Sequence, residues 1–243
     1  MHVDKECRIV FHFIKFDFRR RIMDNQTSKK NDQLDRIIAE LKEAIPSVTY
    51  NSTRETDLSV EQKAIKRFLD ERGIHYLIHF TDAENVSSIK KTGILSIEEL
   101  KRNHIPFKSN DDSRHDNALD YISLSVSEIN QFVYKAFRYD RKTIQHGVKV
   151  IIDAAILYLE INTPRIYSNT NAANLSAAKG ADLEALRGMF ADLVEYDDRH
   201  FDRNKKTPYQ PTDLQAEILW YRCVPSKYIL CFWDLEEDFF YGN

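Results

Sequence analysis

The chain has 243 residues, 42% of them hydrophobic and 12% aromatic, so it is long enough to bury a full core. Its six glycines and six prolines form no biased tract, which excludes a fibrous or disordered protein. Residues 1–72 carry 15 basic and 13 acidic side chains and residues 73–243 carry 20 and 25, which gives +2, −5 and a net charge of −3. Any contact with nucleic acid must be local, because a net-negative body gives no broad attraction to phosphate.

Cysteine usage and hydropathy indicate the compartment. Cys7, Cys223 and Cys231 are odd in number and lack the spacing of a metal site or a disulfide framework, which favours a reducing compartment. Charges at residues 4–6 interrupt the apolar core that a secretion signal requires. The longest apolar run, residues 148–161, contains charged residues and cannot span a bilayer. We expect a soluble cytoplasmic protein with no membrane partner.

The first part of the chain predicts an extension. Residues 8–18 alternate aromatic or aliphatic side chains with polar ones, which indicates a strand or an exposed arm. Residues 32–45 have apolar positions at helical spacing, and Pro46 ends the pattern. The polar residues 47–57 predict a linker.

A second helix is predicted from Ser59, with Gln62 as its capping-box partner and Gly73 as a left-handed stop. Residues 74–81 then predict a strand. We therefore divide the chain into an N-terminal extension, residues 1–72, and a main domain, residues 73–243.

The next elements are short. Asp82 caps a helix that ends at Gly93, and Ser96 with Glu99 caps another. Residues 103–119 are polar and irregular, and a loop of that length inside a compact domain is usually functional or disordered.

The second half of the main domain mixes strands and helices. The patterns predict a strand over 121–126, an aromatic-rich helix over 128–138, a buried strand over 148–152, helical spacing over 183–193 and a long polar loop over 195–213.

Two final strands are predicted over 216–224 and 228–233. Strands without regular crossover helices favour an α+β fold over a doubly wound sheet.

Familiar site signatures are missing from the sequence. It has no dinucleotide-binding glycine motif, Walker loop, zinc-protease motif or nucleophile elbow, so those enzyme classes lack support. His75 and His79 point to the same side of an extended segment, but they lack further ligands at a metal-site spacing. We expect no metal.

Acid–base chemistry remains. Glu217 stands where a loop enters an apolar strand; it could stabilise a cationic sugar and take a proton from a nucleophile, as cleavage of an N-glycosidic bond requires. His79 and Thr81 share a strand face and could bind ribose hydroxyls. The alternatives are a surface carboxylate for Glu217 and a histidine bonded to backbone for His79.

An ordered set of motifs resembles the DarT family of nucleic-acid ADP-ribosyltransferase toxins. No single motif is specific, but their order and spacing over about residues 73–233 are. The motifs are His79-Phe80-Thr81, Asn85-Val86-Ser87-Ser88-Ile89, Gly93-Ile94-Leu95-Ser96, Tyr121-Ile122-Ser123-Leu124-Ser125, Phe132-Val133-Tyr134-Lys135, Asn171-Ala172-Ala173 and Gln215-Ala216-Glu217-Ile218-Leu219.

The resemblance implies an ADP-ribosyltransferase fold in which two small packed sheets surround a cleft for NAD, the ADP-ribose donor. It implies Glu217 as the catalytic residue, with His79 and Thr81 near the adenine-side ribose and Gly93 near the nicotinamide end.

A family arginine has no clear counterpart, because Ser125-Val126-Ser127-Glu128 stands where some members place it. Arg114, Lys135 and Arg138 are candidates for the NAD diphosphate. Tyr134 could stack on an aromatic ring, although an aromatic residue at helical spacing is more often core.

The segment before Glu217 corresponds to the family's substrate-recognition loop. Its cations and aromatic residues could hold phosphate and stack an exposed base, whereas nearby acidic residues also fit a solvated loop. The candidates are Tyr196, Arg199, His200, Arg203, Lys205, Lys206 and Tyr209.

The resemblance therefore predicts an NAD-dependent ADP-ribosyltransferase that modifies a base in single-stranded nucleic acid, most simply DNA, and acts as a toxin or defence effector with an antitoxin protein as partner. A single-stranded target avoids the cost of flipping a base out of a duplex. Alternatives are transfer to RNA or protein, NAD hydrolysis and a non-catalytic NAD-binding interaction module.

Overall fold

The computed structural model describes residues 57–109, 118–130, 134–140 and 142–234. They belong to one compact unit that spans residues 50–243. The strand or arm expected over 8–18, the helix over 32–45 and most of the expected linker lie outside the described residues.

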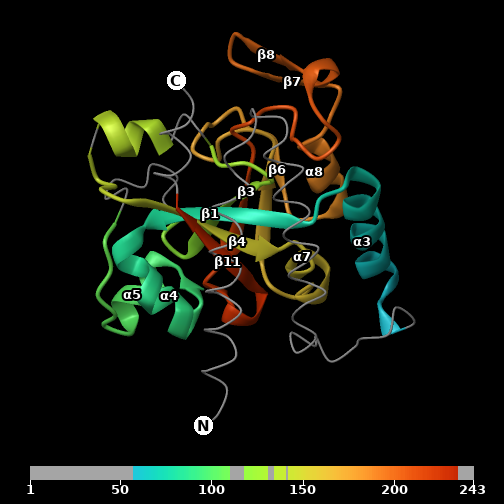
Figure 1. The fold of residues 1–243 in the computed structure, drawn as a ribbon. Helices are drawn as coiled ribbons and strands as arrows, with labels where there is room; N and C mark the ends of the chain where they lie inside the picture. Colours follow the sequence, from blue (N-terminus) through green and yellow to red (C-terminus); the bar gives the residue numbers. More distant parts are fainter. Residues whose placement is uncertain (1–56, 110–117, 131–133, 141, 235–243) are drawn as a thin grey trace, which may run out of the picture. The chain divides into compact units, whose positions relative to one another are not determined.

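The main element is an antiparallel sheet of seven strands in the order β11–β4–β1–β3–β9–β5–β6 (Figure 1). β1 has the longest ladder, with seven residue pairs to β4. The strands are β1 (Tyr76–Asp82), β3 (Tyr121–Val126), β4 (Gly147–Asp153), β5 (Arg165–Ser168), β6 (Lys179–Gly180), β9 (Glu217–Tyr221) and β11 (Ile229–Asp234).

The sheet has a narrow junction between β1 and β3. These strands pair only at Leu77 with Val126 and at Ile78 with Ser125. Beyond this point β1 continues along β4, whereas residues 121–124 of β3 pair with β9. Two half-sheets, β11–β4–β1 and β3–β9–β5–β6, therefore meet at the junction and diverge beyond it. The predicted α+β class is confirmed, and the two small sheets of the prediction correspond to halves of one large antiparallel sheet.

Helix α3 (Val60–Arg72) forms as its capping residues predict. The Ser59 hydroxyl accepts from the Gln62 backbone N–H, the Gln62 side chain accepts from Ser59 N, and Gly73 ends the helix with φ 66°. Buried side chains of α3 join the same core as the sheet, and the helix packs against α7 (Ile156–Leu159) and α8 (Leu183–Gly188). The helix lies within residues 1–72, and the boundary predicted at residue 72 stays a prediction.

Short elements cover the other end of β1. The 3₁₀ turn η2 (Ala83–Asn85) leads into α4 (Val86–Thr92), β2 (Ile94–Leu95) and α5 (Ile97–Arg102), and β2 pairs with β10 (Cys223–Val224). The Ser96 hydroxyl accepts from Glu99 N, which confirms the predicted cap of α5. Figure 1 shows α4 and α5 together, away from α3.

The helix expected over 128–138 begins later. Ser127 has φ 61°, and Glu128 N donates to Val126 O, so the chain turns sharply directly after β3. The described helical part is residues 134–135 followed by the π-helical turn η3 (Ala136–Asp140). A non-glycine residue in the left-handed region cannot continue into an α-helix, which explains the late start.

The long polar loop expected over 195–213 contains a β-hairpin. Strands β7 (Leu193–Tyr196) and β8 (Arg199–Asp202) pair directly, and Asp197 turns with φ 51°. In β7 only Val194 and Tyr196 are buried. This short alternation of buried and exposed side chains is difficult to recognise in the sequence because charged residues surround it. The helical spacing assigned to 183–193 accordingly ends early, with α8, and Leu193 starts β7.

No helix in the described part of the chain is long and apolar enough to cross a membrane.

Candidate active site

A cleft of about 350 Å³ opens where the half-sheets diverge. Its walls come from β1, β3, α4, residues 107–109 and the chain around Asn171. The predicted site residues His79, Thr81, Gly93 and Glu217 all line it. The structure therefore brings together two strand ends separated by most of the domain.

Glu217 is the first residue of β9, and its carboxylate is held at both oxygens. Oε1 accepts from the backbone N–H of Ala172 at 2.7 Å, and Oε2 accepts from the Ser123 hydroxyl. Lys179 Nζ fixes the Ala172 carbonyl at 2.6 Å. An oriented, half-buried carboxylate in a cleft differs from the solvated surface glutamate that the sequence left open.

His79 is fixed by the same serine. Its Nδ1 lies 3.0 Å from the Ser123 carbonyl oxygen. Because a carbonyl oxygen only accepts, Nδ1 carries the hydrogen, and in the neutral imidazole the lone pair is on Nε2. The backbone-bonded alternative for His79 and a position in the cleft are thus both realised. Ser123 connects β1 to the glutamate on β9.

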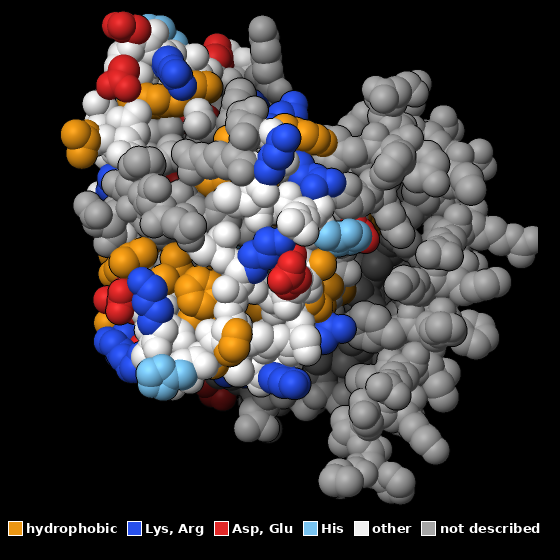
Figure 2. Space-filling view, turned by 90° about the vertical axis from the view of Figure 1, so that its left-hand side faces the viewer, with side chains coloured by type: hydrophobic (Ala, Val, Ile, Leu, Met, Phe, Trp, Pro, Cys, Tyr) orange, Lys and Arg blue, Asp and Glu red, His pale blue; other side chains and the backbone are white. Residues whose placement is uncertain are grey.

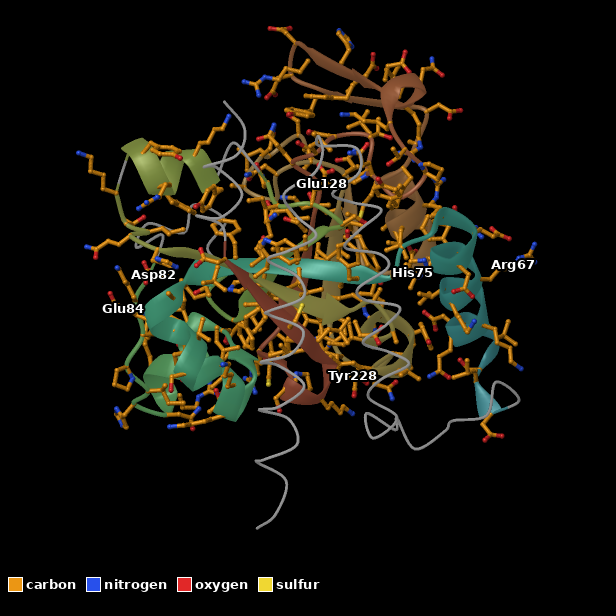
Figure 3. The ribbon with its side chains drawn as sticks, in the orientation of Figure 1. Arg67, His75, Asp82, Glu84, Glu128 and Tyr228 are labelled. Atoms are coloured by element: carbon orange, nitrogen blue, oxygen red, sulfur yellow. The ribbon has the colours of Figure 1, made fainter. Side chains whose placement is uncertain are left out.

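The end of β1 is anchored by a buried carboxylate. Asp82 is 1% exposed, and its carboxylate accepts from Gln145 N at 2.8 Å and pairs with Lys108 Nζ at 3.0 Å. Burial by itself raises the pKa of Asp82, but hydrogen bonds from the backbone of Glu84 and Gln145 and from Lys108 outweigh it and hold that pKa below its ordinary value. Figure 3 shows Asp82 and Glu84 side by side at this end of β1.

Gly93 has a packing requirement of its own. It adopts φ 80°, and an added Cβ would lie 2.3 Å from the backbone oxygen of Val224. The position therefore excludes any side chain where α4 passes into β2, beside the floor of the cleft.

The other predicted cofactor contacts lie elsewhere. Arg114 is outside the described residues. Lys135 is exposed, and the Arg138 guanidinium donates to the carbonyls of Ile144 and Gln145; neither lines the cleft. Tyr134 is 1% exposed and packs edge-on against Phe80, with ring centroids 5.9 Å apart, so this position gives no support to stacking on NAD. The diphosphate contact stays a prediction.

Two of the predicted nucleic-acid residues are exposed on β8. Arg199 and His200 face solvent, and His200 Nδ1 lies 2.8 Å from the carboxylate of Glu195. Lys206 and Tyr209 are half-buried, and the side chain of Lys205 lies outside the description.

Two others support the fold of this segment. Tyr196 is buried, stacks on Phe201 at 5.4 Å and accepts a hydrogen bond from Gln215. The Arg203 guanidinium donates to three backbone carbonyls, at 2.5 Å to Gln210 and 2.8 Å to Thr207 and Pro208. Both hold the segment that precedes Glu217.

Sequence reasoning missed three site components: the Ser123 side chain, the Ala172 backbone N–H and Asn85. Ser123 carried a usable signal, because it is a polar residue on a largely buried strand, facing the same side as Ser125. A backbone donor such as Ala172 N carries none, since any residue supplies it.

The described residues contain no cluster of side chains that could bind a metal ion. No group of three or more His, Cys, Asp or Glu side chains among them is placed to hold an ion. His75 is exposed and lies at the opposite end of β1 from Asp82 (Figure 3). On the face over α4 and α5, Figure 2 shows basic and acidic side chains interspersed among the described residues.

Comparison with known proteins identifies the family. The model of the family described as "ssDNA thymidine ADP-ribosyltransferase, DarT" matches residues 78–233. No curated protein matches. Among similar solved structures, Thermus sp. 2.9 DarT in complex with ADP-ribosylated ssDNA is 17% identical, with a TM-score of 0.46, and the match covers 65% of this chain and 79% of that one.

A second Thermus sp. 2.9 DarT structure, in complex with NAD+, is 17% identical, with a TM-score of 0.44 over 64% of this chain and 79% of that one. Thermosipho africanus DarTG in complex with ADP-ribose is also 17% identical, with a TM-score of 0.44, and the match covers 64% of this chain and 42% of that one. The family match spans more than half of the chain and includes every described residue of the cleft. The chain therefore belongs to the DarT family of single-stranded DNA thymidine ADP-ribosyltransferases and is an ADP-ribosyltransferase.

Proposed function

We propose that this protein transfers ADP-ribose from NAD to a thymidine base in single-stranded DNA, that Glu217 is the catalytic residue, and that the reaction serves a toxin or defence role countered by an antitoxin protein. The observation that carries the proposal is the Glu217 carboxylate, held by Ser123 and Ala172 in the cleft that His79 and Thr81 also line.

NAD recognition follows from the two polar residues on β1. His79 and Thr81 are two positions apart and face one side of the strand. In its neutral form the imidazole offers an acceptor at Nε2, and the threonine hydroxyl can donate. A donor beside an acceptor suits the two neighbouring hydroxyls of a ribose, one of which donates while the other accepts.

The chemical step uses the carboxylate twice. The bond between the ribose C1′ and the nicotinamide nitrogen breaks with its electron pair going to nicotinamide, which leaves a cationic sugar that the Glu217 carboxylate stabilises. A base nitrogen of the target then bonds to C1′, and its proton passes to Glu217. Thymidine has one nitrogen that bears a proton, N3, so this route predicts modification at that atom.

Target binding is assigned to the β7–β8 hairpin and the chain that follows it. Arg199 and His200 are exposed there, and Lys206 and Tyr209 are partly exposed. Cations for phosphate and an aromatic ring for stacking suit a single strand. An unpaired strand also spares the enzyme the cost of extruding the base from a duplex.

The test is a substrate screen with the full-length protein and NAD. A thymidine-containing DNA oligonucleotide should gain the mass of one ADP-ribose, whereas the same DNA without thymidine, the matched RNA and a protein pool should not. Modification of RNA or protein instead would overturn the assigned target. NAD binding without nicotinamide release would favour an interaction module.

Glu217→Gln separates catalysis from binding. Loss of the carboxylate should lower the rate of transfer about 10²- to 10⁴-fold. The affinity for NAD, measured by calorimetry, should stay unchanged. Retained transfer would remove the assignment of Glu217. For the biological role, induced wild-type protein should stop growth of the host cell while Glu217→Gln should not.

A further inference from the structure

Asn85 connects three parts of the cleft through one amide group. It ends η2, directly after β1, and lines the cleft. Its Nδ2 donates to the carbonyl of Lys108 and to the Thr81 hydroxyl oxygen, both at 2.9 Å, and its Oδ1 accepts from Lys108 N at 2.8 Å.

The two backbone bonds fix the orientation of the amide. A backbone N–H only donates and a carbonyl only accepts, so the Lys108 backbone can pair with the Asn85 side chain in one orientation. The remaining Nδ2 hydrogen is the one directed at Thr81. Thr81 is therefore the acceptor in this hydrogen bond.

This bond sets the direction of the threonine hydroxyl. A hydroxyl has one hydrogen. Because a lone pair of the Thr81 oxygen faces Asn85, the hydrogen must point away from Asn85. Thr81 is 4% exposed and lines the cleft, and no described residue accepts a hydrogen bond from its hydroxyl. A buried hydroxyl needs a hydrogen-bond partner, and a ligand bound in the cleft can supply the acceptor.

We propose that Asn85 is a positioning residue that makes the Thr81 hydroxyl a donor toward a ribose oxygen of NAD. The ligand is taken from the proposed function, on which this inference rests. Without the amide, the hydroxyl could rotate and present a lone pair to the ligand oxygen, which repels it.

The same amide also holds the cleft wall at residues 107–109, but this wall has a second anchor. Lys108 Nζ pairs with Asp82 at 3.0 Å and with Glu84 at 3.1 Å. The wall thus depends on Asn85 and on the lysine ammonium, whereas the direction of the Thr81 hydroxyl depends on Asn85. These two roles can be separated by mutation.

The experiment is a double-mutant cycle on the full-length protein, with the NAD dissociation constant from calorimetry and kcat and KM from transfer to DNA. Asn85→Ala should weaken NAD binding about tenfold, the effect of one hydrogen bond, and change kcat less than KM. In a Thr81→Val background the hydroxyl is gone, so Asn85→Ala should add only the smaller loss that comes from the loosened wall. In a Thr81→Ser background the hydroxyl remains and the full effect should return.

Two further variants guard the interpretation. Asn85→Asp keeps the acceptor for Lys108 N and removes both donors, so it should act like Asn85→Ala if the alanine variant unfolds. Lys108→Met loosens the wall and removes one partner of Asp82, but it leaves the bond between Asn85 and Thr81 in place, so it should weaken NAD binding equally in both Thr81 backgrounds.

Equal effects of Asn85→Ala in the Thr81→Val and Thr81→Ser backgrounds would overturn the positioning role. A wild-type protein that does not bind NAD would instead overturn the proposed function itself, and normal NAD binding unaffected by Thr81→Val would overturn this inference alone.

Discussion

The cleft and the β7–β8 hairpin use polar residues in opposite ways. In the cleft, His79 and Glu217 each bind a backbone group, at 3.0 and 2.7 Å, and at the adjoining end of β1 Asp82 does so at 2.8 Å; all three side chains are at least half-buried. On the hairpin, Arg199 and His200 are exposed among acidic neighbours. Preorganised groups suit the stabilisation of a transition state, whereas exposed side chains can adjust to a flexible strand. Chemistry is thus expected at the first region and target contact at the second.

The hairpin segment is nevertheless anchored at its base. Thr170 Oγ1 donates to the buried carboxylate of Asp213 at 2.6 Å, and Arg203 holds three carbonyls of the chain between the hairpin and Glu217. Fixed ends and an exposed tip would allow target binding without moving the Glu217 carboxylate.

The largest effect is expected at the floor of the cleft, from Gly93→Ala. The new Cβ would meet the Val224 oxygen at 2.3 Å on a backbone with φ 80°. Strain and overpacking each cost about 1–3 kcal/mol, so we expect the free energy of unfolding to fall by about 4 kcal/mol. Denaturant titration followed by circular dichroism would measure it.

Two other glycines serve as matched controls. Gly73 has φ 66° with no heavy atom within 4 Å of an added Cβ, so alanine there should cost only the backbone strain, about 1 kcal/mol. Gly188 has neither problem, and alanine should stabilise the protein by about 0.5 kcal/mol. Equal losses at Gly93 and Gly73 would show that the contact with Val224 is unimportant.

The next effect concerns catalysis and sharpens the idea of a preorganised cleft. Ser123→Ala removes the hydroxyl donor to Glu217 and leaves the carbonyl that accepts from His79. A hydrogen bond to a charged group contributes about 1.5–3 kcal/mol, so kcat should fall about 10- to 150-fold while KM for NAD changes little. Ser125→Ala, in the same cleft, is the control. An unchanged kcat in Ser123→Ala would show that Glu217 needs no such support.

The cleft and the hairpin also differ in how much of their structure could be predicted from the sequence. Helix α3 was predictable because its capping box and Gly73 are local signals. His79, Thr81, Gly93 and Glu217 were found because strand ends and an ordered motif set identify them, and the structure brings all four to one cleft. Their individual roles in NAD binding and catalysis stay predictions.

The hairpin could not be foreseen in the same way. Tyr196 and Arg203 have the residue types that bind nucleic acid, yet one stacks on Phe201 and the other binds backbone carbonyls. Residue type alone does not distinguish these roles, because a guanidinium donates hydrogen bonds to backbone carbonyls as well as to phosphate. Asn85 was missed for a related reason, since its partner Lys108 is distant in sequence.

The end of β1 gives a pH-dependent prediction of intermediate size. The folded-state pKa of Asp82 lies below its ordinary value of 3.8, so its stabilising contribution is present above that value and is lost as pH falls through the lowered pKa. Asp82→Asn should therefore destabilise the protein by about 2 kcal/mol at pH 7, and the difference from wild type should shrink below about pH 4. Thermal unfolding from pH 3 to pH 7 would measure this, and a difference that grows toward low pH would contradict the sign.

The smallest effects test whether the two arginines of the hairpin segment differ as their contacts indicate. Arg203→Ala leaves three carbonyls without their donor and should lower stability by about 1 kcal/mol. Arg199→Gln should leave stability within about 0.5 kcal/mol, because the side chain is exposed. If Arg199 contacts a phosphate, its loss should weaken DNA binding and reduce the slope of log affinity against log salt by about one unit. Fluorescence anisotropy with a labelled oligonucleotide at several salt concentrations measures that slope. An unchanged slope would mean that Arg199 is a solvated surface residue and that another part of the protein contacts the target.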